Sequence, residues 1–165
     1  MARPHIEFIQ SQVLPWQDGV YSGGWPGVES RILSKDEAAG DASLLIRYPP
    51  GWSRPGAEHI LADEELFVLE GAIEISGTVY DRHCYAHLPA GYTRKDAGSI
   101  DGAVVLTFFS ANPEVRAGVP EPGRYDEALL VRRLSTLEMP WDDRPLRPAA
   151  RSQHRLQTVQ QDPVA

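Results

Sequence analysis

Short apolar runs that end at glycine or proline restrict what this chain can fold into more than any other feature. The runs are rich in β-branched and aromatic residues, and they cover residues 42–48, 64–70, 72–76, 78–80, 84–88 and 103–110. Runs this short, separated by turn residues at intervals of roughly 8–12 residues, are typical of an all-β sandwich or small barrel. We therefore predict an all-β fold built from short strands.

The length of 165 residues suffices for one domain with a sizeable core. Frequent glycine and proline, 14 of each, agree with many turns between short strands. Residues 127–137 could add one strand or a short helix. We divide the chain into an N-terminal arm with the first strands, a barrel core, a C-terminal extension and a poorly ordered tail, at residues 1–41, 42–112, 113–143 and 144–165.

Composition and charge exclude several functional classes. The formal net charge of −7 argues against a nucleic-acid partner, which would require clustered lysine and arginine. No apolar run approaches the roughly 20 residues needed to span a bilayer, so we expect no membrane partner. The N-terminus lacks the apolar segment of a signal peptide, and one cysteine, Cys84, excludes an internal disulfide. We expect a cytoplasmic protein.

One stretch, from Gly51 to Gly71, places ionisable side chains directly before an apolar strand. A histidine and a carboxylate, His59 and Glu64, are costly to bury without partners, so their placement indicates a site. Their spacing resembles the first motif of the cupins: glycine, five residues, His-x-His, four residues, glutamate, six residues, glycine. Four of the five positions match, and Ala57 stands where the first histidine belongs.

A second cupin motif is matched in part. It consists of glycine, five residues, Pro-x-Gly, two residues and histidine, and Pro89-Ala-Gly91 fits its centre. His83 stands in place of the first glycine and Arg94 in place of the final histidine. Across residues 42–110 the chain looks most like the ChrR-like cupins, through Phe67 to Gly71, Tyr85 and Gly102 to Leu106. The resemblance implies a one-domain jelly-roll barrel.

The same resemblance implies a metal held by three histidines and one glutamate. Position by position, this chain keeps only His59 and Glu64 of that set. Two protein ligands make a weak site, and the fixed charge of Arg94 repels a divalent cation. We therefore expect Arg94 to form a buried ion pair with Glu64, in the place of the metal. The alternative is that Arg94 and Lys95 lie on an exposed loop.

A substitute ligand is available in His87, which shares a strand face with Tyr85. If His87 faces inward, it could form a two-histidine, one-carboxylate site with His59 and Glu64 for iron, zinc or nickel. The alternative is that His87 fills space or faces solvent. Any catalysis would depend on His59 or His87, with Tyr85 or Tyr92 as the hydroxyl partner.

Three functions follow. The first is a metal-free or metal-poor cupin that binds a small, possibly anionic organic molecule through Arg94, Glu64, Tyr92 and Trp52. The second is a metal-dependent dioxygenase or hydrolase, so whether the protein is an enzyme stays open. The third is a sensor or regulatory module. We also expect a homodimer, because the 64–70 strand is apolar on both faces and requires a cover on each.

Overall fold

The structure, a computed structural model, describes residues 8–19, 25–121 and 124–140. These residues contain eleven strands and two short 3-10 helices, η1 (Ser11–Val13) and η2 (Glu127–Leu129). The strands are β1 (Gln17–Asp18), β2 (Glu29–Lys35), β3 (Ala42–Tyr48), β4 (Trp52–Ile60), β5 (Glu64–Ile75), β6 (Thr78–Asp81), β7 (Cys84–Leu88), β8 (Arg94–Ser99), β9 (Ala103–Phe109), β10 (Val115–Ala117) and β11 (Val131–Ser135).

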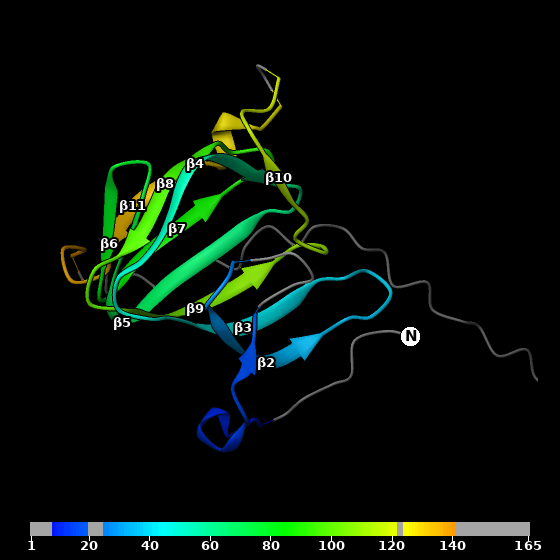
Figure 1. The fold of residues 1–165 in the computed structure, drawn as a ribbon, viewed down its shortest axis with the longest axis vertical. Helices are drawn as coiled ribbons and strands as arrows, with labels where there is room; N and C mark the ends of the chain where they lie inside the picture. The colour runs from blue at the N-terminus through cyan, green and yellow to red at the C-terminus, as the bar shows by residue number, and fades with distance from the viewer. Residues whose placement is uncertain (1–7, 20–24, 122–123, 141–165) are drawn as a thin grey trace, which may run out of the picture.

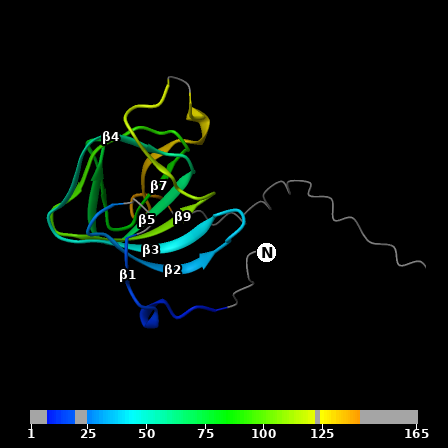
Figure 2. The same ribbon diagram turned by 45° about the vertical axis from the view of Figure 1, so that its right-hand side comes forward.

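The strands form two antiparallel sheets that share β5 and curl toward each other (Figures 1 and 2). The first sheet runs β1-β2-β3-β9-β5-β7-β11 and uses the N-terminal half of β5. The second runs β6-β5-β8-β4-β10 and uses the C-terminal half of β5. One long strand therefore connects the two walls of the barrel.

The passage of β5 from one sheet to the other occurs at Gly71. This residue has a φ of 68°, and a Cβ built on it would lie 2.0 Å from the carbonyl oxygen of Gly102. Only glycine fits such a close approach at a left-handed φ. The strand can therefore change sheets without losing its pairing with β9, which continues to the Gly71–Ala103 pair.

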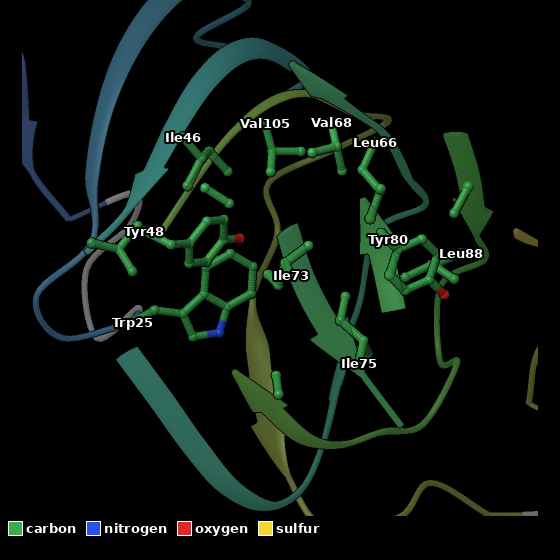
Figure 3. Close-up of a cluster of buried hydrophobic side chains, with 14 of the residues drawn as sticks. Trp25, Ile46, Tyr48, Leu66, Val68, Ile73, Ile75, Tyr80, Leu88 and Val105 are labelled. Atoms are coloured by element: carbon green, nitrogen blue, oxygen red, sulfur yellow. The ribbon is translucent and has the colours of Figure 1, made fainter. Parts of the chain in front are cut away.

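The core lies between the two sheets. Buried residues alternate with more exposed ones along β7 and β9, and Figure 3 shows Ile46, Leu66, Val68, Ile73 and Val105 pointing toward one another. Aromatic residues complete this core at its edges, namely Trp25, Tyr48, Trp52, Tyr80 and Tyr92. The interior is thus mainly apolar, which makes each buried charge within it conspicuous.

The prediction of an all-β jelly-roll fold is confirmed. The predicted strands 42–48 and 84–88 have the bounds of β3 and β7, and 64–70 and 72–76 form the single strand β5. Residues 127–137 contain both a helical turn, η2, and the strand β11. The tail 144–165 lies outside the described residues. In the part of the chain that is described, no helix has the length and apolarity that crossing a bilayer requires.

Candidate functional site

Two oppositely charged side chains meet inside the barrel. Glu64 begins β5 and Arg94 begins β8, and their residues are only 2% and 3% exposed. The Arg94 guanidinium donates a hydrogen bond through Nη1 to Glu64 Oε2. The expected contact between these residues is therefore present. Away from water their attraction offsets a large desolvation cost, so each charge depends on the other.

An irregularity in the pairing of β4 with β8, where Pro55 and Gly56 lie opposite the single residue Asp96, turns Arg94 inward. Ala97 and Ser99 face the core, so simple alternation would put Lys95 inside and Arg94 outside. Asp96 interrupts this alternation with a φ of 51°, and its Oδ1 accepts a hydrogen bond of 2.9 Å from the backbone N–H of Gly56. Aspartate tolerates this backbone region better than most residues. Lys95 is consequently exposed while Arg94 is buried.

A second buried carboxylate, Glu58, was not predicted from the sequence. It is 6% exposed on β4, and its Oε1 accepts a hydrogen bond of 3.0 Å from Trp25 Nε1. Its Oε2 accepts a hydrogen bond from Arg54 Nε, within an ion pair. The inward positions of β4 share the parity of Trp52 and Ile60. That apolar alternation was the available indication that Glu58 faces inward.

Aromatic rings lie beside these charges. Tyr48 contacts Trp25 and Trp52, with ring centroids 6.1 Å and 4.8 Å apart, and Figure 3 shows Trp25 and Tyr48 side by side. Burial raises the pKa of Tyr48 well above its usual value, and the negative charge of Glu64 raises it further. Tyr48 therefore stays a neutral phenol, able to donate a hydrogen bond but unsuited to act as a base.

His59 does not face the barrel interior. It lies between the inward residues Glu58 and Ile60 of β4, so its ring is on the opposite face of the strand. Its Nδ1 lies 3.1 Å from the carbonyl oxygen of Gly118, just beyond β10. The motif spacing suggested a ligand beside Glu64, but strand alternation assigns the inward position to Glu58.

His87 and Tyr85 also lie on an outer face, because Cys84, Ala86 and Leu88 are the buried residues of β7. The inward orientation considered for His87 is therefore wrong. Its Nδ1 is 2.6 Å from the carbonyl oxygen of Leu129 in η2. Tyr85 donates a hydrogen bond of 2.7 Å to Glu65 Oε2; burial, together with this bond, raises its pKa to about 12.

The hypothetical metal set of His59, Glu64 and His87 is consequently not assembled. Within residues 8–19, 25–121 and 124–140, no group of three His, Cys, Asp or Glu side chains could hold a metal ion. The two inward carboxylates are engaged by the guanidinium groups of Arg94 and Arg54. Iron, zinc and nickel sites use imidazole or several anionic ligands, so the residues present do not fit such an ion.

The other two predicted ligand-binding residues are buried. Tyr92 is 7% exposed and packs edge-to-face on Tyr125, with ring centroids 5.7 Å apart. Trp52 donates from Nε1 to the carbonyl oxygen of Pro26 at 3.2 Å. Trp52 therefore belongs to the aromatic core, where it contacts Trp25 and Tyr48.

Three buried side-chain atoms have no hydrogen-bond partner among the described residues: Arg31 Nε, whose guanidinium lies over the Trp16 ring, and the two interior atoms Arg94 Nε and Thr107 Oγ1. Thr107 is fully buried on β9, opposite Leu66 of β5 and two residue pairs along from Glu64. Buried donors and hydroxyl groups in folded proteins are almost always paired with protein or water. These two atoms therefore indicate that a water molecule or ligand completes the interior beside the ion pair.

The two curled sheets, with a buried Arg94–Glu64 ion pair between them, define a jelly-roll barrel. A family model described as the ChrR cupin-like domain matches residues 5–112. The chain belongs to this family of cupins. A search of the curated proteins found no significant match.

Solved structures confirm the fold. A putative dioxygenase from Nostoc punctiforme superposes with a TM-score of 0.71 at 18% identity, covering 81% of this chain and 49% of that one. This chain thus spans about half the length of that neighbour. A putative acetylacetone dioxygenase from Methylibium petroleiphilum gives 0.58 at 14% identity, over 71% and 83% of the two chains. The polyketide cyclase RemF from Streptomyces resistomycificus gives 0.56 at 15% identity, over 71% and 89%.

Proposed function

We propose that this cupin binds a small, uncharged organic molecule inside its barrel, beside an ion pair that replaces the family's metal. The observation that carries the proposal is the buried Arg94–Glu64 pair with Arg94 Nε and Thr107 Oγ1 left unpartnered. A ligand carbonyl would accept a hydrogen bond from Arg94 Nε–H. A second oxygen would pair with the Thr107 hydroxyl.

The balance of buried charges favours an uncharged ligand over an anion. The interior carboxylates of Glu58 and Glu64 are matched by the guanidinium groups of Arg54 and Arg94. An incoming carboxylate would have to displace Glu64 from Arg94 and leave it buried without a partner, which is strongly unfavourable. A neutral carbonyl compound avoids this cost, and the rings of Trp25 and Tyr48 provide apolar contacts for its carbon skeleton.

Two other functions remain as alternatives. The neighbours named as dioxygenases favour a metal-dependent enzyme, although the similarity in fold alone does not supply the missing ligands. A sensor or regulatory module, the third function considered from the sequence, is the other alternative. A stoichiometric transition metal would favour the first alternative, and recovery of one specific protein partner would favour the second.

Trp25 provides the test, because it hydrogen-bonds Glu58 in the barrel interior and reports on ligand entry through its fluorescence. The probes are pentane-2,4-dione and acetophenone, with 4-oxopentanoate as an anion of similar size to the first. We expect a saturable change with the neutral probes, and at least roughly tenfold weaker binding of the anion, which corresponds to 1.4 kcal/mol.

Thr107→Val removes the unpartnered hydroxyl with little change of shape, so it should weaken binding of the neutral probes. Tyr85→Phe, on the outer face of β7, is the matched control and should leave binding unchanged. Absence of saturable binding by both neutral probes, or unaltered binding by Thr107→Val, would contradict the proposal.

A further inference from the structure

The outer face of the second sheet carries a groove that is separate from the barrel interior. It has a volume of about 580 Å³ and is lined by residues of β4, β5, β6 and β8 with the loops before β4 and after β8, most of them exposed and a few, such as Trp52 and Ile73, buried. In Figure 1 the strands β6, β8 and β4 lie together on one side of the barrel. The volume lies within the roughly 300–1,000 Å³ of pockets that hold small molecules.

Gly98 forms the floor of this groove. Its neighbours Ala97 and Ser99 face the core, so position 98 faces outward between β5 and β4. A Cβ built here would meet the carbonyl oxygen of Trp52 at 3.4 Å, which is ordinary contact, and its φ lies outside the left-handed region. The backbone at position 98 could carry a larger side chain, and such a side chain would fill the groove. The groove is therefore open because residue 98 is glycine.

The walls of the groove are apolar. Val79 and Ile100 line it and are 50% and 85% exposed, and Pro55 and Ala72 add further apolar surface. Contiguous exposed apolar surface on a folded domain is a common mark of a binding site. The walls would cover the hydrocarbon part of a ligand.

The charges at the groove have one sign. Glu74, Asp96 and Asp101 line it, and among the residues that the structure describes no lysine or arginine does. Asp96 Oδ1 already accepts from Gly56, which leaves Glu74 and Asp101 as the carboxylates free to meet a ligand. Because a hollow lined by carboxylates concentrates cations, we propose that this groove binds a small organic cation with an apolar body, such as an aromatic or aliphatic ammonium compound.

Isothermal titration at low salt with 1-naphthylmethylammonium, and with 1-naphthylacetate as the anion of the same ring system, tests the proposal. We expect the cation to bind at least roughly tenfold more tightly than the anion, and the difference to shrink as salt screens the carboxylates. Equal affinity for the two probes, or no binding of either, would overturn it.

Two variants of groove residues, with one control variant, locate the site. Gly98→Leu fills the floor and should abolish binding of the cation, whereas Lys95→Leu, an exposed position of the same strand outside the groove, should not. Glu74→Gln should weaken the affinity for the cation by about threefold to tenfold and leave the affinity for neutral 1-naphthylmethanol unchanged. Circular dichroism confirms that each variant is folded. Cation binding that survives Gly98→Leu would refute the assignment.

Light scattering on the same variants separates this occupant from a second copy of the chain. A dimer that Gly98→Leu converts to monomer would show that the groove is a subunit interface and would replace the proposal. The tests of this site and of the barrel site are independent, because Thr107 faces the interior from β9 in the first sheet, whereas Gly98 faces outward from β8 in the second.

Discussion

Arg94 places a permanent cation where other cupins place a metal ligand. A guanidinium cannot lose its proton to coordinate a metal, but it satisfies a buried carboxylate with directed hydrogen bonds. The partner carboxylate, Glu64, is 2% exposed, so without Arg94 it would be a bare charge in an apolar interior. The two residues therefore act as one unit in stability.

Removing Arg94 alone should be far more damaging than removing both charges. We expect Arg94→Met to lower the free energy of unfolding by about 3–5 kcal/mol, since Glu64 is left unpaired. The double variant Arg94→Met with Glu64→Leu should recover most of this loss, and urea denaturation measures both. A single variant that costs less than about 1 kcal/mol, the usual value of an exposed pair, would place Arg94 in solvent and contradict the structure.

Tyr80 should make stability depend on alkaline pH. Burial raises the pKa of Tyr80 to about 12, while an unfolded tyrosine ionises near 10. The folded state favours the neutral phenol, so this stabilisation is complete below about pH 10 and is lost as pH rises toward 12. The free energy of unfolding of wild type should therefore fall between pH 10 and 12. We expect the fall in Tyr80→Phe to be smaller by on the order of 2 kcal/mol. Identical losses would show that Tyr80 is not shielded in the fold.

The residues of the barrel site could be predicted from the sequence only in part. The exchange of a histidine position for Arg94 indicated the pair with Glu64, because one ligand is absent and a cation is present. His59 was placed inward from motif spacing, whereas alternation with Trp52 and Ile60 puts Glu58 there. The orientation of Arg94 depends on the left-handed Asp96 and its bond to Gly56, which no local pattern announces.

Among the strands, β5 connects the two sheets, because it pairs with β9 and β7 in one sheet and with β6 and β8 in the other. Its bend at Gly71 brings the backbone against Gly102. The geometry of this bend therefore sets how the two sheets face each other.

Gly71→Ala tests that bend against a matched position. Gly77 has a similar positive φ of 74° but nothing within 4 Å of a built Cβ, whereas at Gly71 the carbonyl oxygen of Gly102 obstructs it. We expect Gly77→Ala to cost about 1–2 kcal/mol from backbone strain alone. Gly71→Ala should cost several kcal/mol more by thermal or urea unfolding. Equal costs would show that β5 and the Gly102 turn are not in contact.

Strand prediction succeeded where apolar runs were continuous and failed where they were not. β3 and β7 read plainly as strands, but β4 contains Pro55 and Gly56 and begins in a polar stretch. β8, Arg94–Ser99, is nearly all polar or small. β8 forms between β5 and β4, and β4 forms between β8 and β10, so both strands depend on hydrogen-bond partners from distant parts of the chain.

The whole molecule presents an apolar outer face on its first sheet. Phe108 is 42% exposed there, and the outward side chains of Phe67, Leu69 and Leu106 are partly exposed beside it. The homodimer expected from the sequence stays a prediction, and this face is where we place it. Such a surface is costly in water and would be covered by a second copy.

Light scattering at micromolar concentration should give twice the 18.3 kDa mass of one chain. Phe108→Asp should convert the protein to a monomer, because a charge cannot be buried at an apolar interface without a partner. Val79→Asp, at an exposed apolar position of the second sheet, is the control and should stay dimeric. A monomeric wild-type protein would contradict this prediction.

Metal content tests the central claim most directly, because the claim is that an arginine–glutamate pair replaces the metal of the family. The protein should be produced with iron, zinc and nickel supplied, purified without chelators and analysed by elemental mass spectrometry. We predict far less than one equivalent of any transition metal per chain, and the same low metal content in Glu64→Gln. One equivalent of bound metal that Glu64→Gln abolishes would contradict the account.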